Sequence, residues 1–294
     1  MKIIYAVGNR ISGSIRLARF LKNIDNKHEI KIAGYSESTY LISHVEWILN
    51  SISLTKLAFK NSLYSAKYNQ DYISNIIKDV IEFDPDLIIS DDEYVFSLMA
   101  NELNIPLWYC SPLNMIDGIK WEEKHIYSYF FFHHKRYKFP KADEYLIYSP
   151  FCDIENPPKL KENYNWVRPY YENCSHYLIE NIERKEKLDS IIKYVKLKDD
   201  YFFTDGNTDY ISDAIYNNKK IIITPSINNV DSLINSVLVE KYNIGYNLGQ
   251  IELMNMLAIE EIEKAYNKTY DEIVLNNEQY LQLHEKVEEY ALTL

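Results

Sequence analysis

Short apolar runs alternate with amphipathic stretches along the first half of the chain. The clearest amphipathic stretch is at 73–81, where isoleucine and valine recur every three or four positions, as on one face of a helix. The expected strands are residues 3–7, 30–33, 87–90, 107–110 and 145–149, with further helices at 14–21 and 95–103. Strands that alternate with helices predict a parallel sheet covered by helices, with binding loops at the carboxyl ends of the strands.

A polar stretch at 153–161 separates this half from the next, and it contains Pro157 and Pro158, as linkers often do. The pattern then resumes with a helical stretch that ends near Val195, followed by strand and helix units that begin at 201 and 221. A chain of 294 residues is long enough for two domains. We expect an N-terminal Rossmann-like domain at 1–152, a linker at 153–168 and a reduced C-terminal Rossmann-like domain with a helical tail at 169–294.

The turn after residues 201–204 is a candidate phosphate site, because helical spacing begins again at Tyr210. Free N–H groups and the positive end of the helix dipole favour phosphate oxygens there, and Thr208 adds a hydroxyl donor. Gly206 is one of only 7 glycines in the chain, which strengthens the case for a functional turn. The alternative is that Asp205 or Thr208 caps the helix and Gly206 makes an ordinary tight turn.

Asp231 and Asn235 lie one helical turn apart in the next unit, beside an apolar stripe. This pair has the donors and acceptors to bind sugar hydroxyls. A helix start rich in asparagine, aspartate and serine is also an ordinary capping sequence. The sequence leaves both interpretations open.

Composition narrows the functional classes. A net charge of -11 disfavours a general electrostatic grip on nucleic acid, and three cysteines without close pairing indicate neither a disulfide framework nor a zinc site. No apolar run approaches a membrane span, and the first eight residues are too short for a signal-peptide core. We therefore expect a cytoplasmic protein that requires no metal.

One segment is basic although the chain as a whole is acidic. Aromatic residues at 129–132 lead into His133, His134, Lys135 and Arg136. Aromatic rings beside cations can hold nucleotides, anionic lipid headgroups or a glycan. The alternative is a buried edge followed by a solvated turn. Neither histidine has a carboxylate or cysteine at ligand spacing, so the patch predicts no metal site.

Taken in order, these pieces resemble the glycosyltransferases of the GT-B fold, in particular the macrolide, plant natural-product and lipid-precursor branch. The segments 85–91 and 104–107 look like a strand and the start of another strand in that branch's first domain. The stretch 205–208 falls where the family has a His-Gly-Gly-x-x-Thr or Ser phosphate loop. Pro225, Asp231, Ser232 and Asn235 fall where the family has proline, then Asp-Gln, then Asn. Roughly two thirds of the chain takes part in the resemblance.

The departures from the family pattern concern its chemistry. The family's histidine base follows a glycine at the first loop, where the nearest match here is Gly13-Ser14, and serine cannot replace that base. The sugar-binding glutamine is Ser232. The loop histidine is Asp205, whose negative charge is unfavourable beside a diphosphate. The second domain also looks short by about one strand and helix unit.

The resemblance implies sugar transfer, with inversion, from a nucleoside diphosphate sugar such as a UDP-sugar to an acceptor hydroxyl. The sugar donor is a co-substrate, and no other cofactor is implied. We expect Asp91 to be the base, with Asp92 and Glu93 as alternatives, because these residues follow a strand at its carboxyl end. Like charges at three adjacent positions repel, which favours a proton on one of them. The alternative is a solvated acidic helix start.

The remaining site residues are assigned by position. The expected donor-binding residues are Gly206, Asn207, Thr208, Asp231, Ser232, Asn235 and Arg168. Gly13, Ser14 and Arg16 would let the acceptor or a phosphate approach the first loop. Structural roles for Arg16 and Arg168 are the alternative.

The acceptor stays open. A small molecule or a glycan suits the acidic chain. A hydroxymethylated pyrimidine in phage DNA suits the residues at 133–136 and a composition rich in residues with A- and T-rich codons, since some phages encode GT-B enzymes that glycosylate DNA; such a protein would work in the host cytoplasm. Two other classes remain: a sugar-nucleotide hydrolase or epimerase on the same fold, and a non-catalytic nucleotide-sugar-binding protein.

Overall fold

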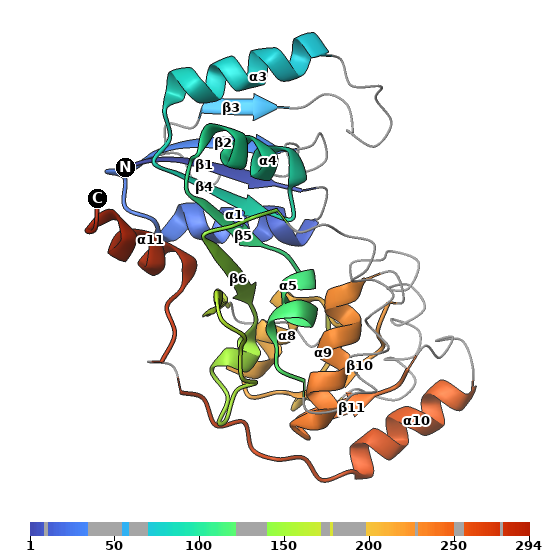
Figure 1. Cartoon of the computed structure of the whole chain (residues 1–294). Helices are drawn as coiled ribbons and strands as arrows, with labels where there is room; N and C mark the ends of the chain where they lie inside the picture. Colours follow the sequence, from blue (N-terminus) through green and yellow to red (C-terminus); the bar gives the residue numbers. More distant parts are fainter. Residues whose placement is uncertain are drawn as a thin grey trace. The chain divides into compact units, whose positions relative to one another are not determined.

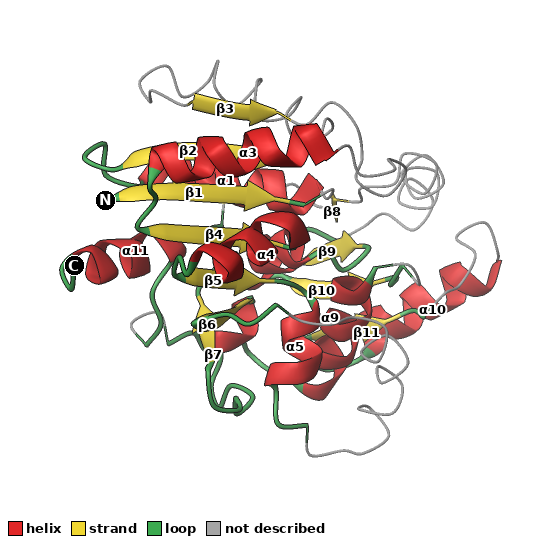
Figure 2. Cartoon of the chain, turned by 45° about the horizontal axis from the view of Figure 1, so that its top comes forward, coloured by secondary structure: helices red, strands yellow, loops and turns green. Residues whose placement is uncertain are grey.

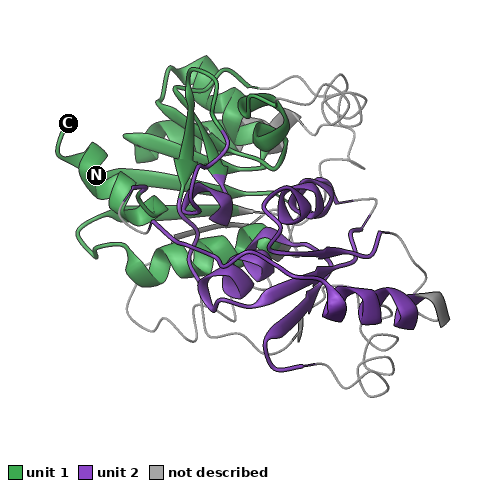
Figure 3. Ribbon diagram, turned by 90° about the horizontal axis from the view of Figure 1, so that it is seen from below, with its two compact units in different colours: residues 1–147, 159–167, 281–294 green, residues 148–158, 168–280 purple. Residues whose placement is uncertain are grey.

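The computed structural model in Figure 1 describes residues 1–8, 11–34, 55–58, 70–121, 140–171, 177–178, 198–226, 229–249, 256–276 and 279–294. The chain forms two compact units, coloured separately in Figure 3. The first unit consists of residues 1–147, 159–167 and 281–294, and the second of residues 148–158 and 168–280.

The first unit is built on a seven-stranded sheet in the order β3-β2-β1-β4-β5-β6-β7. Neighbouring strands from β3 to β6 pair in parallel, as predicted. The strands are β1 (Lys2–Val7), β2 (Glu29–Gly34), β3 (Thr55–Ala58), β4 (Leu87–Asp91), β5 (Leu107–Cys110), β6 (Glu144–Tyr148) and β7 (Tyr164–Val167). All five residues of β4 are buried, which explains why its first three residues are apolar, while Ser90 and Asp91 are buried polar residues at its carboxyl end.

Helices cover both faces of this sheet (Figure 2). The helices of the first unit are α1 (Ile11–Asn23), α3 (Gln70–Phe83), α4 (Tyr94–Leu103), α5 (Leu113–Gly118) and α11 (Leu283–Ala291). Ile4 and Ala6 of β1 belong to the apolar cluster that holds residues of α3 and α4. Tyr5 packs against Phe20 of α1 with ring centroids 5.2 Å apart. Because successive strand residues point to opposite faces, α1 covers the face opposite to α3 and α4.

The second unit has a smaller parallel sheet in the order β11-β10-β9-β8. Its strands are β8 (Tyr177–Leu178), β9 (Tyr201–Thr204), β10 (Lys220–Ile223) and β11 (Gly245–Asn247), and its helices are η1 (Pro150–Cys152), α8 (Thr208–Tyr216), α9 (Val230–Lys241) and α10 (Met256–Asn267). Ala258, Ile262 and Ala265 of α10 are buried in a cluster with sheet residues. Two parallel α/β sheets are the architecture that the sequence predicts.

The unit boundaries differ from those we expected. β7 lies within the predicted linker but is an edge strand of the first sheet. The predicted C-terminal domain extends to 294, whereas α11 belongs to the first unit. Glu288 of α11 contacts Lys27 at 2.6 Å and His28 at 3.0 Å. The spacing of buried Leu283 and Val287 predicts a helix, but spacing alone does not say which sheet the helix covers.

Candidate active site

Three consecutive carboxylates lie at the carboxyl end of β4. Asp91 is the last residue of the strand, and Asp92 and Glu93 connect it to α4. In the parallel register Asp91 is paired with Val7 at the end of β1 and with Cys110 at the end of β5. The three side chains nevertheless have different surroundings, and their chemistry differs accordingly.

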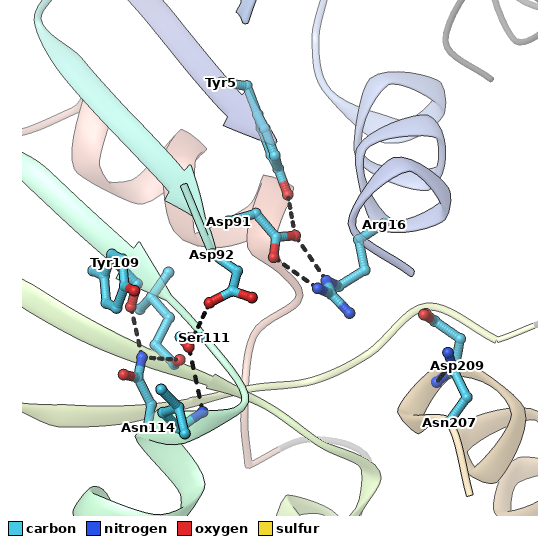
Figure 4. A network of polar contacts seen from close by, with 11 residues as sticks. Tyr5, Arg16, Asp91, Asp92, Tyr109, Ser111, Asn114, Asn207 and Asp209 are labelled. Carbon is cyan, nitrogen blue, oxygen red and sulfur yellow. Dashed lines mark hydrogen bonds and ion pairs between the residues drawn. The ribbon is translucent and has the colours of Figure 1, made fainter. Parts of the chain in front are cut away.

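Asp91 is the buried partner of Arg16 (Figure 4), with 1% of its surface exposed. Arg16 donates from Nε to Oδ2 at 2.8 Å and from Nη2 to Oδ1 at 2.7 Å. The Tyr5 hydroxyl donates to the same Oδ2 at 3.4 Å. A buried carboxylate held at both oxygens by a guanidinium is costly to separate from its partner. This geometry disfavours our expectation that Asp91 is the base and gives it a structural pairing role.

The first-loop residues Gly13, Ser14 and Arg16 lie on α1, against this end of β4. A Cβ atom on Gly13 would lie 2.9 Å from the Val7 side chain and 3.6 Å from the Asp91 carboxylate. Glycine therefore allows the helix to approach closely enough for Arg16 to reach Asp91. Ser14 is 2% exposed, and among the described residues its hydroxyl has no hydrogen-bond partner.

Glu93 caps α4. One of its carboxylate oxygens accepts from the Val95 N–H at 3.1 Å and the other from the Phe96 N–H at 2.7 Å. Its backbone is extended and only 2% of its surface is exposed. Glu93 thus satisfies two otherwise orphaned N–H groups at the helix start. Glu93 therefore lies at an acidic helix start, as in our alternative interpretation, but it is buried and not solvated.

Asp92 is the one carboxylate of the three that is only half-buried. Its backbone has a φ of 55°, in the left-handed region. The Asp92 N–H donates to the Cys110 carbonyl at 2.7 Å, and the Gly8 N–H donates to the Asp91 carbonyl at 2.8 Å. A Cβ atom on Gly8 would lie 2.3 Å from the Asp92 carbonyl oxygen. The ends of β1 and β5 therefore fix the backbone of this turn.

The side chain of Asp92 contacts Ser111, the residue after β5 (Figure 4). The Ser111 hydroxyl donates to Asp92 Oδ1 at 2.9 Å. Tyr109 is close by: burial raises the pKa of its phenol, the negative charge of Asp92 raises it further, and a hydrogen bond with Ser111 opposes the rise. The phenol therefore stays protonated at neutral pH. Ser111 and Tyr109 are site residues that our sequence reasoning missed, because only the pairing of β4 with β5 brings them to Asp92.

The second polar region is the loop between β9 and α8. Gly206 has a φ of 89°, and a Cβ atom there would lie 2.6 Å from Ile223 Cδ1 and 3.0 Å from Ser232 backbone atoms. The Asn207 side chain caps α8 by accepting from the Asp209 N–H at 2.9 Å. The Gly206 N–H donates to Thr204 Oγ1 at 3.1 Å, and the Asn207 N–H donates to Asp205 Oδ1 at 3.4 Å. Side chains near the loop thus already accept from its N–H groups.

Two residues of α9 that we expected to bind the sugar, Ser232 and Asn235, form hydrogen bonds with this loop. Asn235 donates from Nδ2 to the Gly206 carbonyl at 2.8 Å and to Thr208 Oγ1 at 3.1 Å. The Ser232 hydroxyl donates to the Asp205 carbonyl. Asp231 is 3% exposed in the first turn of α9, and its N–H donates to Asn229 Oδ1 at 3.0 Å. Asn235 Oδ1 is buried and has no hydrogen-bond partner within the described part of the chain.

Arg168 lies near the carboxylate of Asp153 in the second unit. Burial raises the pKa of Asp153, while a hydrogen bond from the Tyr216 hydroxyl and the charge of Arg168 oppose the rise. Tyr216 is the last of the nine residues of α8, about 12 Å along the axis from its first residue. The cationic group therefore lies beside the far end of α8, which disfavours the donor-binding role that we expected for it.

The expected patch at His133, His134, Lys135 and Arg136 lies outside the described residues. Among the residues that are described, no group of three or more His, Cys, Asp or Glu side chains is placed to hold a metal ion. No helix in the described segments is long and apolar enough to cross a membrane.

No protein-family model matches the sequence, and no curated protein matches it. The structure is similar to the spinosyn forosaminyltransferase SpnP, with a TM-score of 0.61 and 11% identity over 100% of this chain and 99% of that chain. It is also similar to the glycosyltransferase SnogD from Streptomyces nogalater, with a TM-score of 0.58 and 10% identity over 100% and 99% of the two chains. A UDP-glucosyltransferase from Polygonum tinctorium capable of glucosylating indoxyl gives a TM-score of 0.57 and 11% identity over 90% and 88%. Similarity at such identities establishes the fold, and the protein has the GT-B fold of glycosyltransferases.

Proposed function

We propose that this protein transfers a sugar from a nucleoside diphosphate sugar to an acceptor hydroxyl, with inversion at the anomeric carbon. The observation that carries this proposal is the similarity of the whole chain to glycosyltransferases of the GT-B fold. A fold by itself hosts many chemistries, so the proposal also needs residues that can perform the reaction. Asp92 and the loop between β9 and α8 are the residues proposed for this role.

Asp92 is the proposed base. Its carboxylate takes the proton of the acceptor hydroxyl as the acceptor oxygen attacks the anomeric carbon. The bond between that carbon and the diphosphate oxygen breaks, and the diphosphate leaves with the electron pair from the face opposite to the attack, so the configuration inverts. Asp92 is favoured over its neighbours because it is half-buried, whereas Asp91 is paired with Arg16 and Glu93 caps α4.

The start of α8 is the proposed diphosphate site. A helix start offers N–H groups and a positive dipole end to phosphate oxygens, and these would stabilise the charge that develops on the leaving diphosphate. Asn207 and Asp205 accept from N–H groups of this loop. Binding would therefore require phosphate oxygens to replace these side-chain oxygens. Gly206 and Thr208 remain proposed contact residues, while Ser232 and Asn235 are proposed to support the loop.

A small molecule or a glycan is the proposed acceptor. The net charge of -11 opposes the approach of a DNA backbone, which binds best to clustered lysine and arginine. Hydroxymethylated pyrimidines in DNA are the second acceptor class to test.

A donor screen tests the proposal. Purified protein is titrated by calorimetry and thermal shift with the diphosphate sugars of uridine, guanosine, thymidine and cytidine. UDP-glucose is tested first because one similar structure is a UDP-glucosyltransferase. We expect the diphosphate sugar of one nucleoside to bind. When an acceptor is added, the nucleoside diphosphate should be released. Absence of binding by all four nucleotides contradicts the proposal. Release of the nucleoside diphosphate without an acceptor would instead indicate a hydrolase.

A non-catalytic nucleotide-sugar-binding protein is the second candidate. It is favoured by the engagement of Asp91 with Arg16, which removes one carboxylate from chemistry. Tight donor binding without turnover across small-molecule, glycan and DNA acceptors would support it. Transfer to any of them would reject it.

A further inference from the structure

We propose that Ser111 positions the Asp92 carboxylate for proton abstraction from the acceptor. This role rests on the proposed sugar transfer and adds a residue to it. Ser111 would act through Asp92 and not on the substrate. Its contribution would be to keep the carboxylate in one orientation while the acceptor hydroxyl approaches.

Asp92, Leu113 and Tyr109 surround the Ser111 hydroxyl, and Asp92 accepts its proton because the Leu113 N–H and the protonated Tyr109 phenol carry hydrogens of their own. The Leu113 N–H donates to Ser111 Oγ at 3.3 Å, so one lone pair of the hydroxyl oxygen is occupied. The hydroxyl itself donates to Asp92 Oδ1 at 2.9 Å. Ser111 is 3% exposed, so water has little access to replace this bond. A hydroxyl that donates to a carboxylate stabilises the charged form, which is the form that accepts a proton.

The backbone of Asp92 is already fixed before its side chain is considered. Aspartate adopts the left-handed conformation more readily than most residues other than glycine, and neighbouring structure holds Asp92 in it. Cys110 on one side and Gly8 on the other supply this constraint. With the backbone held by two strands, the Ser111 hydrogen bond holds one oxygen of the carboxylate, Oδ1, in place. Such preorganisation is what proton transfer at a defined site requires.

The groups around Asp92 leave it as the proton acceptor. On β4 and the turn, Asp91 is balanced by Arg16 from α1, and Glu93 is engaged with the start of α4. On β5, Cys110 is a buried thiol. The phenol of Tyr109 is kept protonated by burial and by the charge of Asp92. Of these groups, Asp92 alone combines a carboxylate with partial exposure.

The test compares Ser111→Ala with Ser97→Ala and Ser111→Thr. Ser97 is a matched control because it is a buried serine of the same unit whose hydroxyl bonds to Ser90 and to the Glu93 carbonyl, and not to Asp92. We expect Ser111→Ala to lower kcat roughly tenfold or more, as for loss of a hydrogen bond to a charged group. The KM for the donor should be unchanged. The acid limb of the pH–rate profile should move to higher pH, because the charged form has lost a donor.

Ser111→Thr keeps a hydroxyl and should restore most of the rate, and Ser97→Ala should leave both rate and profile unchanged. A rate and a profile for Ser111→Ala that match those of the wild type would overturn the proposal.

A second measurement does not depend on activity. Carbon-13 NMR of labelled aspartate carboxylates, assigned with Asp92→Asn, follows the titration of Asp92 in each variant. We expect its midpoint to move to higher pH in Ser111→Ala and to stay in place in Ser97→Ala. An unmoved midpoint in Ser111→Ala overturns the Ser111 assignment even if transfer is observed. The midpoint could also move in Ser111→Ala while the wild-type protein transfers no sugar. That result would mean that the hydrogen bond exists and that the proposed function, with the role of Ser111 in it, is wrong.

Discussion

The end of β4 and the loop between β9 and α8 are both polar turns that follow a buried strand of a parallel sheet, yet their side chains are used differently. At the end of β4, three adjacent carboxylates have three surroundings: an ion pair, a half-buried turn and a helix cap. At the second loop, polar side chains from α9 bond to the loop backbone itself. The first region divides its carboxylates between structure and proposed chemistry, whereas the second uses its polar side chains to fix the backbone that would contact the ligand.

The two regions show that the atoms a side chain contacts decide its role. An acidic or amide residue beside a loop can serve the ligand or the loop, and its hydrogen bonds distinguish the two. Variants that remove single contacts can therefore separate stability effects from effects on donor binding or transfer in each region.

The largest expected effect is that of Arg16→Met. The substitution leaves the Asp91 carboxylate buried without its bidentate partner, which we expect to lower the free energy of unfolding by about 3–5 kcal/mol. Urea denaturation measures the loss. The double variant with Asp91→Leu removes both charges and should recover much of the stability. A single variant as stable as the wild type would contradict the structural role of this pair.

Gly206→Ala tests the shape of the second loop. An alanine with a φ of 89° would have a strained backbone, and its Cβ atom would lie 2.6 Å from Ile223 Cδ1. We therefore expect a loss of about 1–3 kcal/mol in the free energy of unfolding. Gly249→Ala is the matched control, because Gly249 has a φ of 66° and no atom within 4 Å of an added Cβ. Gly249→Ala should cost less. Equal losses would mean that backbone strain alone, and not close packing, requires glycine at position 206.

Asn235→Ala tests whether α9 supports the loop or contacts the sugar. Loss of the Nδ2 donor leaves the Gly206 carbonyl and the Thr208 hydroxyl without this partner, at a cost of about 1–3 kcal/mol in unfolding free energy. Donor affinity should fall together with stability. Asn235→Asp, which keeps the shape but not the donor, should behave similarly. Weaker donor binding at unchanged stability would favour the direct sugar contact that the sequence first suggested.

The smallest effect is expected for Glu93→Ala. Removal of this cap should cost about 1 kcal/mol of stability, as for other helix N-caps. Glu93→Gln keeps an oxygen that accepts from the helix N–H groups and should lose less. Thermal unfolding compares the two, and sugar transfer should stay within a few-fold of wild type in both. A large loss of transfer in Glu93→Gln would return Glu93 to the list of candidate bases.

Much of the fold could be predicted from local patterns. Strands β1 and β4 are buried on both faces, so the sequence contains apolar runs at 3–7 and 87–89, and α3 shows its buried face as a repeat of isoleucine and valine. The placement of α11 could not be predicted this way. Its partners Lys27 and His28 lie about 260 positions earlier in the chain, and no local pattern records such a contact.

The same limit applies to the candidate site. The cap at the start of α8 involves residues two positions apart, and a capped helix start was among our alternatives, although the cap is Asn207 and not Asp205 or Thr208. The roles of Asp91 and Asp92 depend on Arg16 and Ser111, which lie 75 and 19 positions away. The parallel order β1-β4-β5 brings these residues together, and a chain of alternating elements fits several strand orders.

We propose that Asp92, and not Asp91, accepts the proton of the acceptor hydroxyl. The most direct measurement is the transfer rate of Asp92→Asn once a donor and an acceptor are known, with donor affinity measured on the same protein. We predict a loss of kcat of about 100-fold or more with unchanged donor affinity, as for removal of a general base. A rate within a few-fold of wild type, at the same donor affinity, would contradict the account.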